Sequence, residues 1–502
     1  MNSKILTIDK LAKRLKLKKN NPILIQCHGV FDILHIGHIK YLEEAKKIGN
    51  ILIVTVTSDK FVKKGIGNPH FNEDIRAQSL AALQCVDYVV INYFETPIKF
   101  IKKIKPNVYV KGPDYKKTKN DKNLNLEKKT IESVGGKIFF TSGQTSSSSM
   151  LINNYTDRYS NNQKSYINNL KNKYSISQIE NSLNSLSNLK VLLIGETIID
   201  EYVYTEAIGK AGKEPIMVSK NKGSEKFAGG IVAVANHISS YCKNLKILSY
   251  LGDKNNSVQF IKKSINKNIK FEYILKKDSP TILKRRFIDL YTKTKMYGVY
   301  NINDSPISES EEKKFINLLD KNLNNYDLVL VIDYGHGLIT EKVVKTIEKN
   351  SKFLAVNIQL NAMNTSFYNH SKYKKMDYFC IHDGELRHGF RDKYLSTEKL
   401  IKKLDKEINA KKIMITKGNQ GTIFYEKNKY VYCPAFASDI VDKIGAGDTL
   451  IAITSLCFRN KIPSYLSSFF GNILAAKSIQ KTGTGNATSK NDLMKIIKYT
   501  LK

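Results

Sequence analysis

Two histidines separated by two residues, His35 and His38, lie in the run 29–38 (GVFDILHIGH). The stretch before it, residues 22–27 (PILIQC), is short, apolar and rich in isoleucine, which predicts a buried strand. From Ile36 onward apolar residues recur at helical spacing, so a helix beginning near His35 would aim its free N–H groups at a bound phosphate. We expect His35 and His38 on neighbouring turns of one helix face.

This histidine pair suits the transfer of a nucleotidyl group. Imidazoles beside a helix N-terminus can donate hydrogen bonds to an α-phosphate while pyrophosphate leaves, where negative charge develops. One alternative is a zinc site, but no third cysteine, histidine or carboxylate stands nearby at ligand spacing, and we predict no resident metal. Another is that one histidine is an ordinary core residue.

A second candidate centre is the run 439–449 (DIVDKIGAGDT), which leads into an apolar helix. Glycines leave backbone N–H groups accessible at the start of such a helix, where phosphate oxygens gain charge during transfer. Asp448 follows this turn and is the candidate base for an attacking hydroxyl. The candidate phosphate-binding residues of the turn are Gly445, Ala446 and Gly447.

Other polar residues stand where a substrate could be held in the same half of the chain. Asp200 follows a buried strand at 191–195 and is a candidate partner for a polyol hydroxyl. Gly229 and Gly230 precede a helical run and permit close approach of a ligand to the backbone. We therefore expect a sugar or polyol site here.

Strands and helices alternate along both halves of the chain, which predicts two α/β domains with doubly wound, largely parallel sheets. In such sheets polar residues at the strand ends face the ligand. The strands expected are 22–27, 51–57, 87–91 and 107–110, then 191–195, 327–333, 353–357 and 413–416.

Two loops add possible phosphate ligands. Lys63 or Lys64 could meet triphosphate charge, although a lysine in so basic a chain is by default solvated. Serines 146–149 precede an apolar helical turn and suit an anion-binding cap, the alternative being a linker. Residues 153 to about 174 are polar and rich in asparagine, and we expect an irregular interdomain linker there.

Length and composition indicate a globular protein of two or three domains. The chain has 502 residues, 41% hydrophobic and 10% aromatic, enough for packed cores. No apolar stretch reaches membrane-spanning length and the N-terminus lacks a signal-peptide pattern, so we expect a cytoplasmic protein. Its six cysteines form no CxxC and are expected as core thiols.

The formal charge of +35 invites a nucleic-acid interpretation. The lysines, however, are dispersed among isoleucines and asparagines along the whole chain, which with the absence of tryptophan is typical of low-GC coding. We therefore expect no nucleic-acid partner. A steep salt dependence of affinity for DNA or RNA would contradict this expectation.

The run 29–38 resembles the signature of the cytidylyltransferase-like nucleotidyltransferases. With residues 86–90 (VDYVV), 96–115 (TPIKFIKKIKPNVYVKGPDY) and the serine cluster, the resemblance covers about residues 7 to 152. It is similar to the nucleotidyltransferase half of the bifunctional ADP-heptose synthesis proteins, and less closely to glycerol-3-phosphate cytidylyltransferases. It implies that His35 and His38 stabilise the transferring phosphate. The nucleotide-binding residues that it implies are Gly29, Val30, Phe31, Asp32, Lys63, Arg76, Lys111, Ser147, Ser148 and Ser149. His28 departs from the usual pattern, and its role is open.

The later half resembles the ribokinase (PfkB) family of carbohydrate kinases from about residue 188 to 500. The resemblance rests on the turn before Asp448, on Gly229 with Gly230, and on Thr416-Lys417-Gly418 with Gly421. It extends to the kinase half of the ADP-heptose synthesis proteins and implies that Thr416 and Gly418 contact nucleotide. The halves stand in the opposite order here. Positions that depart from the family pattern are Ala233, Asn357, Gln359 and His382.

Together these observations predict an enzyme that makes a nucleotide-activated sugar, similar to ADP-heptose, for surface glycan synthesis. It would use Mg²⁺ with ATP, and either ATP or CTP for nucleotidyl transfer; its partners would be sugar phosphates, and we expect a homo-oligomer. The alternatives are a CTP-dependent cytidylyltransferase for a glycerol-like phosphate with a divergent kinase domain, or a nucleotidyltransferase joined to a non-catalytic sensing or oligomerisation domain. The predicted domains are residues 1–152 and 188–502, joined by a linker and lead-in helix at 153–187.

Overall fold

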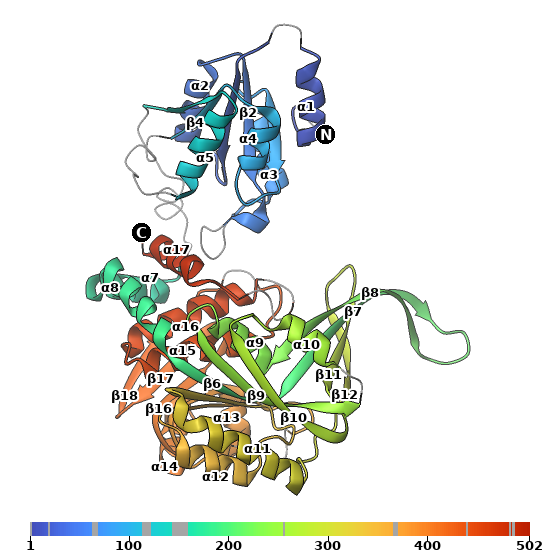
Figure 1. The fold of residues 1–502 in the computed structure, drawn as a ribbon, viewed down its shortest axis with the longest axis vertical. Coiled ribbons are helices and arrows are strands. Elements are labelled where there is room, and N and C mark those ends of the chain that lie inside the picture. The colour runs from blue at the N-terminus through green and yellow to red at the C-terminus, as the bar shows by residue number, and fades with distance from the viewer. Residues whose placement is uncertain are drawn as a thin grey trace. The chain divides into compact units, whose positions relative to one another are not determined.

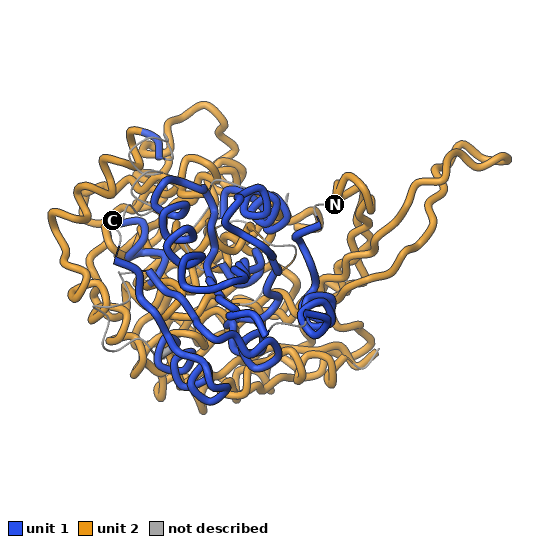
Figure 2. Tube along the Cα trace, turned by 90° about the horizontal axis from the view of Figure 1, so that it is seen from above, with its two compact units in different colours: residues 1–160, 495–502 blue, residues 161–494 orange. Residues whose placement is uncertain are grey.

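The computed structural model describes residues 3–18, 21–62, 69–112, 122–142, 159–254, 257–364, 370–437, 440–480, 483 and 487–501. The chain divides into two compact units, residues 1–160 with 495–502 and residues 161–494 (Figure 2). Each unit contains its own largely parallel sheet, so the predicted α/β class is confirmed.

The first unit is a five-stranded parallel sheet in the order β3-β2-β1-β4-β5 (Figure 1). The order reverses between β1 and β4, which makes their carboxyl ends a switch point where ligands bind in such sheets. Its strands are β1 (Leu24–Gly29), β2 (Ile51–Thr57), β3 (Tyr88–Asn92), β4 (Val108–Lys111) and β5 (Lys137–Phe140). Its helices are α1 (Ile8–Lys16), α2 (Ile36–Lys46), α3 (Glu73–Ala81), α4 (Ile98–Ile104) and α5 (Lys122–Ser133).

The sheet of the first unit is covered on both faces because its central strands are apolar on both. Leu52 and Val54 of β2 pack with Leu42 of α2 and Leu80 of α3. Ile53 packs on the other face, in a cluster with residues of α1 and α4. Successive side chains of a strand point to opposite faces, so a run such as ILIVTVT supplies two cores at once.

The second unit is built on a nine-stranded sheet in the order β10-β9-β6-β13-β14-β15-β16-β17-β18. Its strands are β6 (Lys190–Gly195), β9 (Asn244–Lys254), β10 (Ile269–Pro280), β13 (Leu328–Asp333), β14 (Leu354–Ile358), β15 (Lys375–His382), β16 (Asn409–Thr416), β17 (Thr422–Glu426) and β18 (Lys429–Cys433). The strands from β10 to β16 are parallel, and their carboxyl ends meet at one edge.

A four-stranded sheet, in the order β12-β11-β7-β8, forms the rest of the second unit's β-structure. Its strands are β7 (Thr197–Lys210), β8 (Met217–Gly230), β11 (Ile282–Asp289) and β12 (Lys295–Asn301). The β7–β8 hairpin extends away from the rest of this unit (Figure 1). The helices of the unit include α8 (Ile176–Asn184), α9 (Ile231–Ile238), α10 (Val258–Ser264), α11 (Glu309–Asn322), α12 (Glu341–Asn350), α13 (Asp383–Phe390), α14 (Thr397–Glu407), α15 (Ala446–Arg459) and α16 (Ser464–Ser478), and α17 (Lys490–Thr500) follows them.

The prediction of an irregular linker over residues 153 to 174 is wrong for its second part. Residues Asn161–Lys173 form helix α7, which buries Tyr166, Ile167 and Leu170. The Tyr166 ring stacks on that of Tyr465, with centroids 4.0 Å apart. Spacing of four between Tyr166 and Leu170 is helical, but the many asparagines around it obscured the pattern.

Candidate active sites

The histidine pair of the first unit lies where β1 gives way to α2, as predicted. His35 is the N-cap of α2, and its Nδ1 accepts a hydrogen bond of 3.1 Å from the Gly37 N–H. An accepting Nδ1 places the proton of the neutral ring on Nε2. The ring centroids of His35 and His38 are 4.0 Å apart, and partial burial lowers the pKa of His35. The two imidazoles are therefore gathered at a helix N-terminus, where His35 favours the neutral form.

His28, whose role the sequence left open, lies at the end of β1 beside the same loop. Its Nδ1 is 2.9 Å from the Thr55 hydroxyl and its Nε2 is 3.4 Å from the Thr57 hydroxyl. Burial and the nearby charge of Lys111 lower the pKa of His28 to about 3. It is thus a neutral imidazole at the same edge as His35 and His38. Only a spatial argument could have found it, because it precedes the recognisable run.

Asp32 and Arg76 hold the loop that carries the histidines. The buried Asp32 carboxylate accepts hydrogen bonds from the N–H groups of His70 and Phe71, at 2.8 and 2.9 Å. Arg76 is fully buried and donates to the carbonyls of Val30, Thr57 and Phe71 and to Asp59 Oδ1. A guanidinium with this many protein acceptors fixes the loop geometry.

The helix that carries Arg76 begins before this residue. Helix α3 begins at Glu73, with Asn72 as N-cap. The Asn72 side chain accepts a hydrogen bond of 2.9 Å from Ile75 N–H. Arg76 is therefore inside the helix, with its side chain directed to the strand ends.

The structure describes some of the remaining candidate nucleotide-binding residues of the first unit but not all of them. Gly29 ends β1, and the Phe31 ring lies edge-on to His38, with centroids 5.4 Å apart. Lys111 ends β4, where its ammonium is 2.8 Å from Glu127 Oε2. The candidates Lys63, Lys64, Ser147, Ser148 and Ser149 lie outside the described residues. Their roles stay predictions.

Asp448 lies at the start of α15 in the second unit, as its motif predicts. Its Oδ1 accepts a hydrogen bond of 2.7 Å from Gln359 Nε2 and one of 3.4 Å from the Tyr334 hydroxyl. Burial raises the pKa of Asp448 to about 6, with the Asp200 charge adding to the rise and the Gln359 bond opposing it. A carboxylate in this range suits a general base near neutral pH.

The glycine turn before Asp448 leaves space at the helix start. Gly445 has φ of 85° and is the N-cap of α15, a conformation that favours glycine. A Cβ added at Gly445 or Gly447 would meet no atom within 4 Å. The turn can therefore approach a phosphate closely, with the N-terminus of α15 behind it.

Gly229 and Gly230 allow close packing of protein atoms, whereas the sequence predicted that they allow close approach of a ligand. A Cβ at Gly229 would lie 2.2 Å from Asp200 Oδ2, and one at Gly230 would lie 2.5 Å from Glu196 O. The glycines therefore admit a protein carboxylate and a strand end, and contact with a ligand stays a prediction. Asp200 itself forms an ion pair with Arg286.

Sequence reasoning missed two buried basic side chains near this centre. His336 has no exposed surface, and neither ring nitrogen has a hydrogen-bond partner. Burial and the charges of Lys284 and Lys276 lower its pKa to about 3. Lys284 is 8% exposed, with its ammonium 5.6 Å from the Tyr300 ring and 6.0 Å from the Tyr334 ring. A buried imidazole without hydrogen-bond partners, beside a buried lysine whose charge Asp200 partly offsets, indicates an anion site.

The remaining candidate and divergent positions of the second unit, apart from Ala233, lie at or just after the carboxyl ends of neighbouring strands. Thr416 ends β16 and Gly418 follows with φ of 55°, while the paired position on β15 is His382. Asn357 Nδ2 donates to Cys380 O at 2.9 Å, and Gln359 Nε2 is also 3.3 Å from Asn357 Oδ1. Ala233 is buried in α9. Asn357 on β14 and Gln359 just after it thus belong to the Asp448 network, while Ala233 is buried in α9.

Among the described residues, no group of three or more histidine, cysteine or acidic side chains could hold a metal ion. Within the same ranges, no helix is both long and apolar enough to cross a membrane. All six cysteines are free thiols, and all but Cys85 are buried, which confirms the expectation of core thiols.

Comparison with known proteins finds two families in the chain. The pfkB family carbohydrate kinase model matches residues 188–491, and the cytidylyltransferase-like model matches residues 27–154. Solved structures similar to the chain include Arabidopsis thaliana ribokinase with ribose and ATP (16% identity, TM-score 0.48, 62% of this chain and 99% of that one). Another is Thermotoga maritima ribokinase (18% identity, TM-score 0.49, covering 62% of this chain and 99% of that one).

Curated relatives carry the name bifunctional protein HldE. The relative from Campylobacter jejuni strain RM1221 is 26% identical over 299 residues, which cover 59% of this chain and 62% of the relative. The relative from Aliarcobacter butzleri strain RM4018 is 45% identical over 140 residues, covering 27% of this chain and 29% of the relative. Each alignment thus spans less than two thirds of the relative's length.

The predicted resemblance and the predicted order of the two halves are confirmed. Because the kinase model matches residues 188–491, more than half of the 502 residues, this chain belongs to the pfkB family of carbohydrate kinases and carries a cytidylyltransferase-like domain in its first part.

Proposed function

We propose that this chain is a bifunctional enzyme that makes a nucleotide-activated sugar of the ADP-heptose kind for surface glycan synthesis. One observation carries the proposal: a histidine pair at the start of α2 and a buried carboxylate at the start of α15 occur in one chain. The relatives named HldE support this function over a glycerol-type cytidylyltransferase or a non-catalytic second domain. We further propose the domain limits 1–152 and 188–502, joined by residues 153–187.

In the kinase half, Asp448 accepts the proton of a sugar hydroxyl whose oxygen attacks the γ-phosphorus of ATP, and ADP leaves. The N–H groups of the turn Gly445–Gly447 stabilise the charge that develops on the transferred group. Mg²⁺ bound with the nucleotide would supply positive charge that offsets the charge of the phosphates. Glu385 of α13 would be its protein carboxylate; its oxygens accept hydrogen bonds from the N–H groups of Leu360 and His382, and burial raises its pKa to about 7.

The sugar that enters the kinase half carries a phosphate of its own. We assign that phosphate to the basic group formed by Lys284, Arg286 and His336, which we call the basic cluster. Neither ring nitrogen of His336 has a hydrogen-bond partner, and an anionic group bound beside Lys284 would supply one. Arg286 lies beside Asp200 and reaches the sugar from the same sheet.

In the nucleotidyltransferase half, an oxygen of a sugar phosphate attacks the α-phosphorus of a nucleoside triphosphate, and pyrophosphate leaves. His35 and His38 donate hydrogen bonds to the α-phosphate as charge builds there. Asp32 and Arg76 keep the loop in place rather than contact the reacting atoms.

The experiment that tests this function uses the full chain with each nucleoside triphosphate and a panel of sugar phosphates. Pyrophosphate release reports one activity and ATP-dependent sugar phosphorylation the other. Asp448→Asn should lower phosphorylation by roughly two to four orders of magnitude, with pyrophosphate release unchanged. No turnover of any sugar phosphate in either assay would refute the proposal.

Small molecules are the proposed partners, together with a second copy of the chain. Near the tip of the β7–β8 hairpin, Ile208, Ile216 and Met217 expose 68%, 54% and 71% of their surface. Apolar side chains gathered on a projecting hairpin support self-association. Light scattering should therefore give a mass above that of one chain, and a monomer at all concentrations would contradict this.

A further inference from the structure

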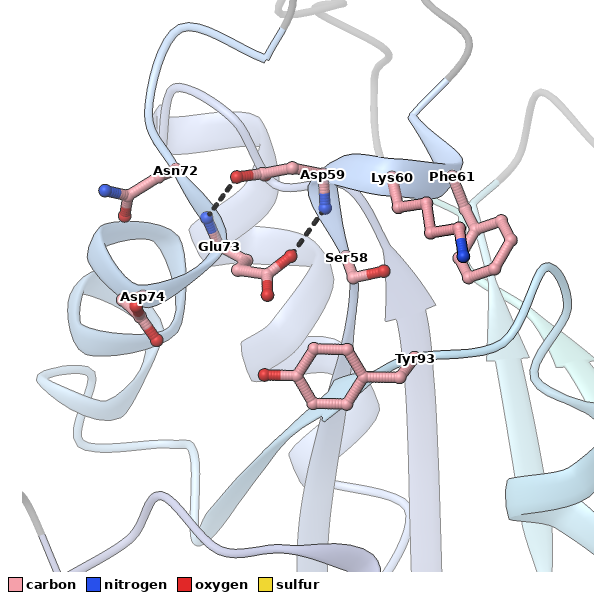
Figure 3. Close-up of a pocket in the computed structure, with 8 residues that line it drawn as sticks. All are labelled: Ser58, Asp59, Lys60, Phe61, Asn72, Glu73, Asp74 and Tyr93. Carbon is pink, nitrogen blue, oxygen red and sulfur yellow. Dashed lines mark hydrogen bonds between the residues drawn. The ribbon is translucent and has the colours of Figure 1, made fainter. Parts of the chain in front are cut away.

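The first unit contains a hollow whose lining residues have no role in the two proposed reactions. It has a volume of about 550 Å³ and is lined by residues that follow β2 and β3 and by the start of α3 (Figure 3). Pockets for small ligands usually span about 300 to 1,000 Å³. We call it the acidic hollow, because Asp59, Glu73 and Asp74 line it against one lysine, Lys60. This is unusual in a chain of formal charge +35.

Backbone N–H groups hold the carboxylates of Asp59 and Glu73 in place, and Asp59 Oδ1 also forms an ion pair with Arg76 at 2.6 Å. Asp59 and Glu73 each accept a hydrogen bond from the other's backbone N–H, at 3.2 and 2.6 Å, which spaces the two carboxylates (Figure 3). They form no metal site, since no three acidic or histidine ligands converge on one point among the described residues. Their remaining acceptor positions suit several hydroxyl donors at once.

An independent observation points to a ligand in this hollow. The Ser58 side chain lines the hollow and is 1% exposed, yet its hydroxyl has no hydrogen-bond partner. Buried hydroxyls without a partner are rare, and each calls for an explanation. Tyr93 adds an aromatic face and a hydroxyl on the other side of the hollow (Figure 3). The nearest explanation for Ser58 is a ligand hydroxyl that fits between Ser58 and the carboxylates.

The hollow is linked directly to the catalytic loop. Ser58 follows Thr57, whose hydroxyl is 3.3 Å from the Gly29 carbonyl. Arg76 joins Asp59 of the hollow to Val30 of the loop. In the strand order β3-β2-β1-β4-β5, the hollow is at the β2 and β3 ends, whereas the switch point lies between β1 and β4. The histidines of α2 therefore stand between two ligand positions.

We propose that the acidic hollow binds the polyhydroxyl part of the sugar phosphate that accepts the nucleotidyl group. This rests on the proposed function and names the position of its second substrate. Asp59 is paired with Arg76, and the carboxylates of Glu73 and Asp74 repel a triphosphate, so the nucleotide occupies the switch point and the sugar's phosphate faces the histidines. The sugar hydroxyls donate to Asp74, Glu73 and Ser58, and the ring lies against Tyr93.

The test measures KM for sugar 1-phosphates and for the nucleoside triphosphate separately in the full chain. Ser58→Ala removes only an unpartnered hydroxyl and should raise the KM of the sugar phosphate by about 3- to 10-fold. Asp74→Asn should raise it by roughly 10-fold or more. Both should leave the KM of the nucleotide within about twofold, as should the control Glu132→Gln on the exposed surface of α5.

Several outcomes distinguish a failure of this inference from a failure of the proposed function. An unchanged sugar KM in both variants, or an equal rise in nucleotide KM, overturns the inference while the activity stands. If the wild type releases no pyrophosphate, calorimetry with the same sugar 1-phosphates decides: binding that Ser58→Ala and Asp74→Asn weaken supports the hollow as a sugar site, and no binding overturns it. Turnover of phosphoethanolamine in preference to sugar 1-phosphates, lost in Asp74→Asn, would assign the hollow to an ammonium group instead.

Discussion

The side-chain amide of Gln359 donates a 2.7 Å hydrogen bond to the carboxylate of Asp448. This donor favours the charged form of Asp448, while burial raises the pKa of the carboxyl to about 6. The protonation of the proposed base is therefore set in part by a neutral amide. Asp448 must be deprotonated to act, and phosphorylation should therefore fall as pH drops through about 6.

Gln359→Leu should move that acidic limb to higher pH, because it removes the bond that opposes protonation of Asp448. The measurement is kcat/KM for phosphorylation between pH 5 and 9, roughly the range in which such a base titrates. Pyrophosphate release by the same variant serves as the internal control. An acidic limb that stays in place would mean that Gln359 does not set the pKa of Asp448.

His35→Ala and His38→Ala should each lower pyrophosphate release by roughly two to three orders of magnitude, because each removes a donor aimed at the developing charge. Sugar phosphorylation should persist in both variants. Near-normal pyrophosphate release, or recovery only on addition of zinc, would argue against the assignment. The 4.0 Å separation of the two rings also predicts that the double variant loses less than the product of the single effects.

Arg76→Met should act through stability and geometry rather than through a lost phosphate contact. It leaves Asp59 and the carbonyls of Thr57 and Val30 without their donor, at a cost of about 2 to 4 kcal/mol. Urea unfolding of the variant should show the loss in the first unit. A variant as stable as the wild type, with only the KM of the nucleotide raised, would instead make Arg76 a phosphate ligand.

The sequence predicted most features that are formed by adjacent residues and few of the contacts between residues far apart in the chain. Strands such as 51–57 and the glycine turn before α15 follow from runs of adjacent residues, and the structure has them. Gln359 and Asp448 are 89 positions apart, and no periodicity brings them together. His336 and Ser58 are notable only because they are buried without partners, a property that has no signature in the sequence. Helix α7 was not predicted because the asparagine-rich composition of this stretch outweighed the single helical spacing between Tyr166 and Leu170.

His336 provides the last prediction, which concerns the basic cluster. Burial and the charges of Lys284 and Lys276 hold its pKa at about 3, so it is neutral in the free enzyme at neutral pH. A sugar phosphate bound beside it would favour the charged form and raise its pKa, and binding should take up a proton. Calorimetry of sugar phosphate binding in buffers of different ionisation enthalpy measures this uptake directly.

His336→Leu should abolish the proton uptake and raise the KM of the phosphorylated sugar by roughly 10-fold, with the KM of ATP unchanged. The variant should fold, because it removes a buried polar side chain whose ring nitrogens have no partner, a group that costs about 1 to 3 kcal/mol when left unsatisfied. The effect of the substitution on stability can be measured separately from its effect on sugar phosphate binding. A gain in stability with the sugar KM and the proton uptake both unchanged would make His336 a residue of the core alone, and the sugar's phosphate would then have to be held by Lys284 and Arg286 without it.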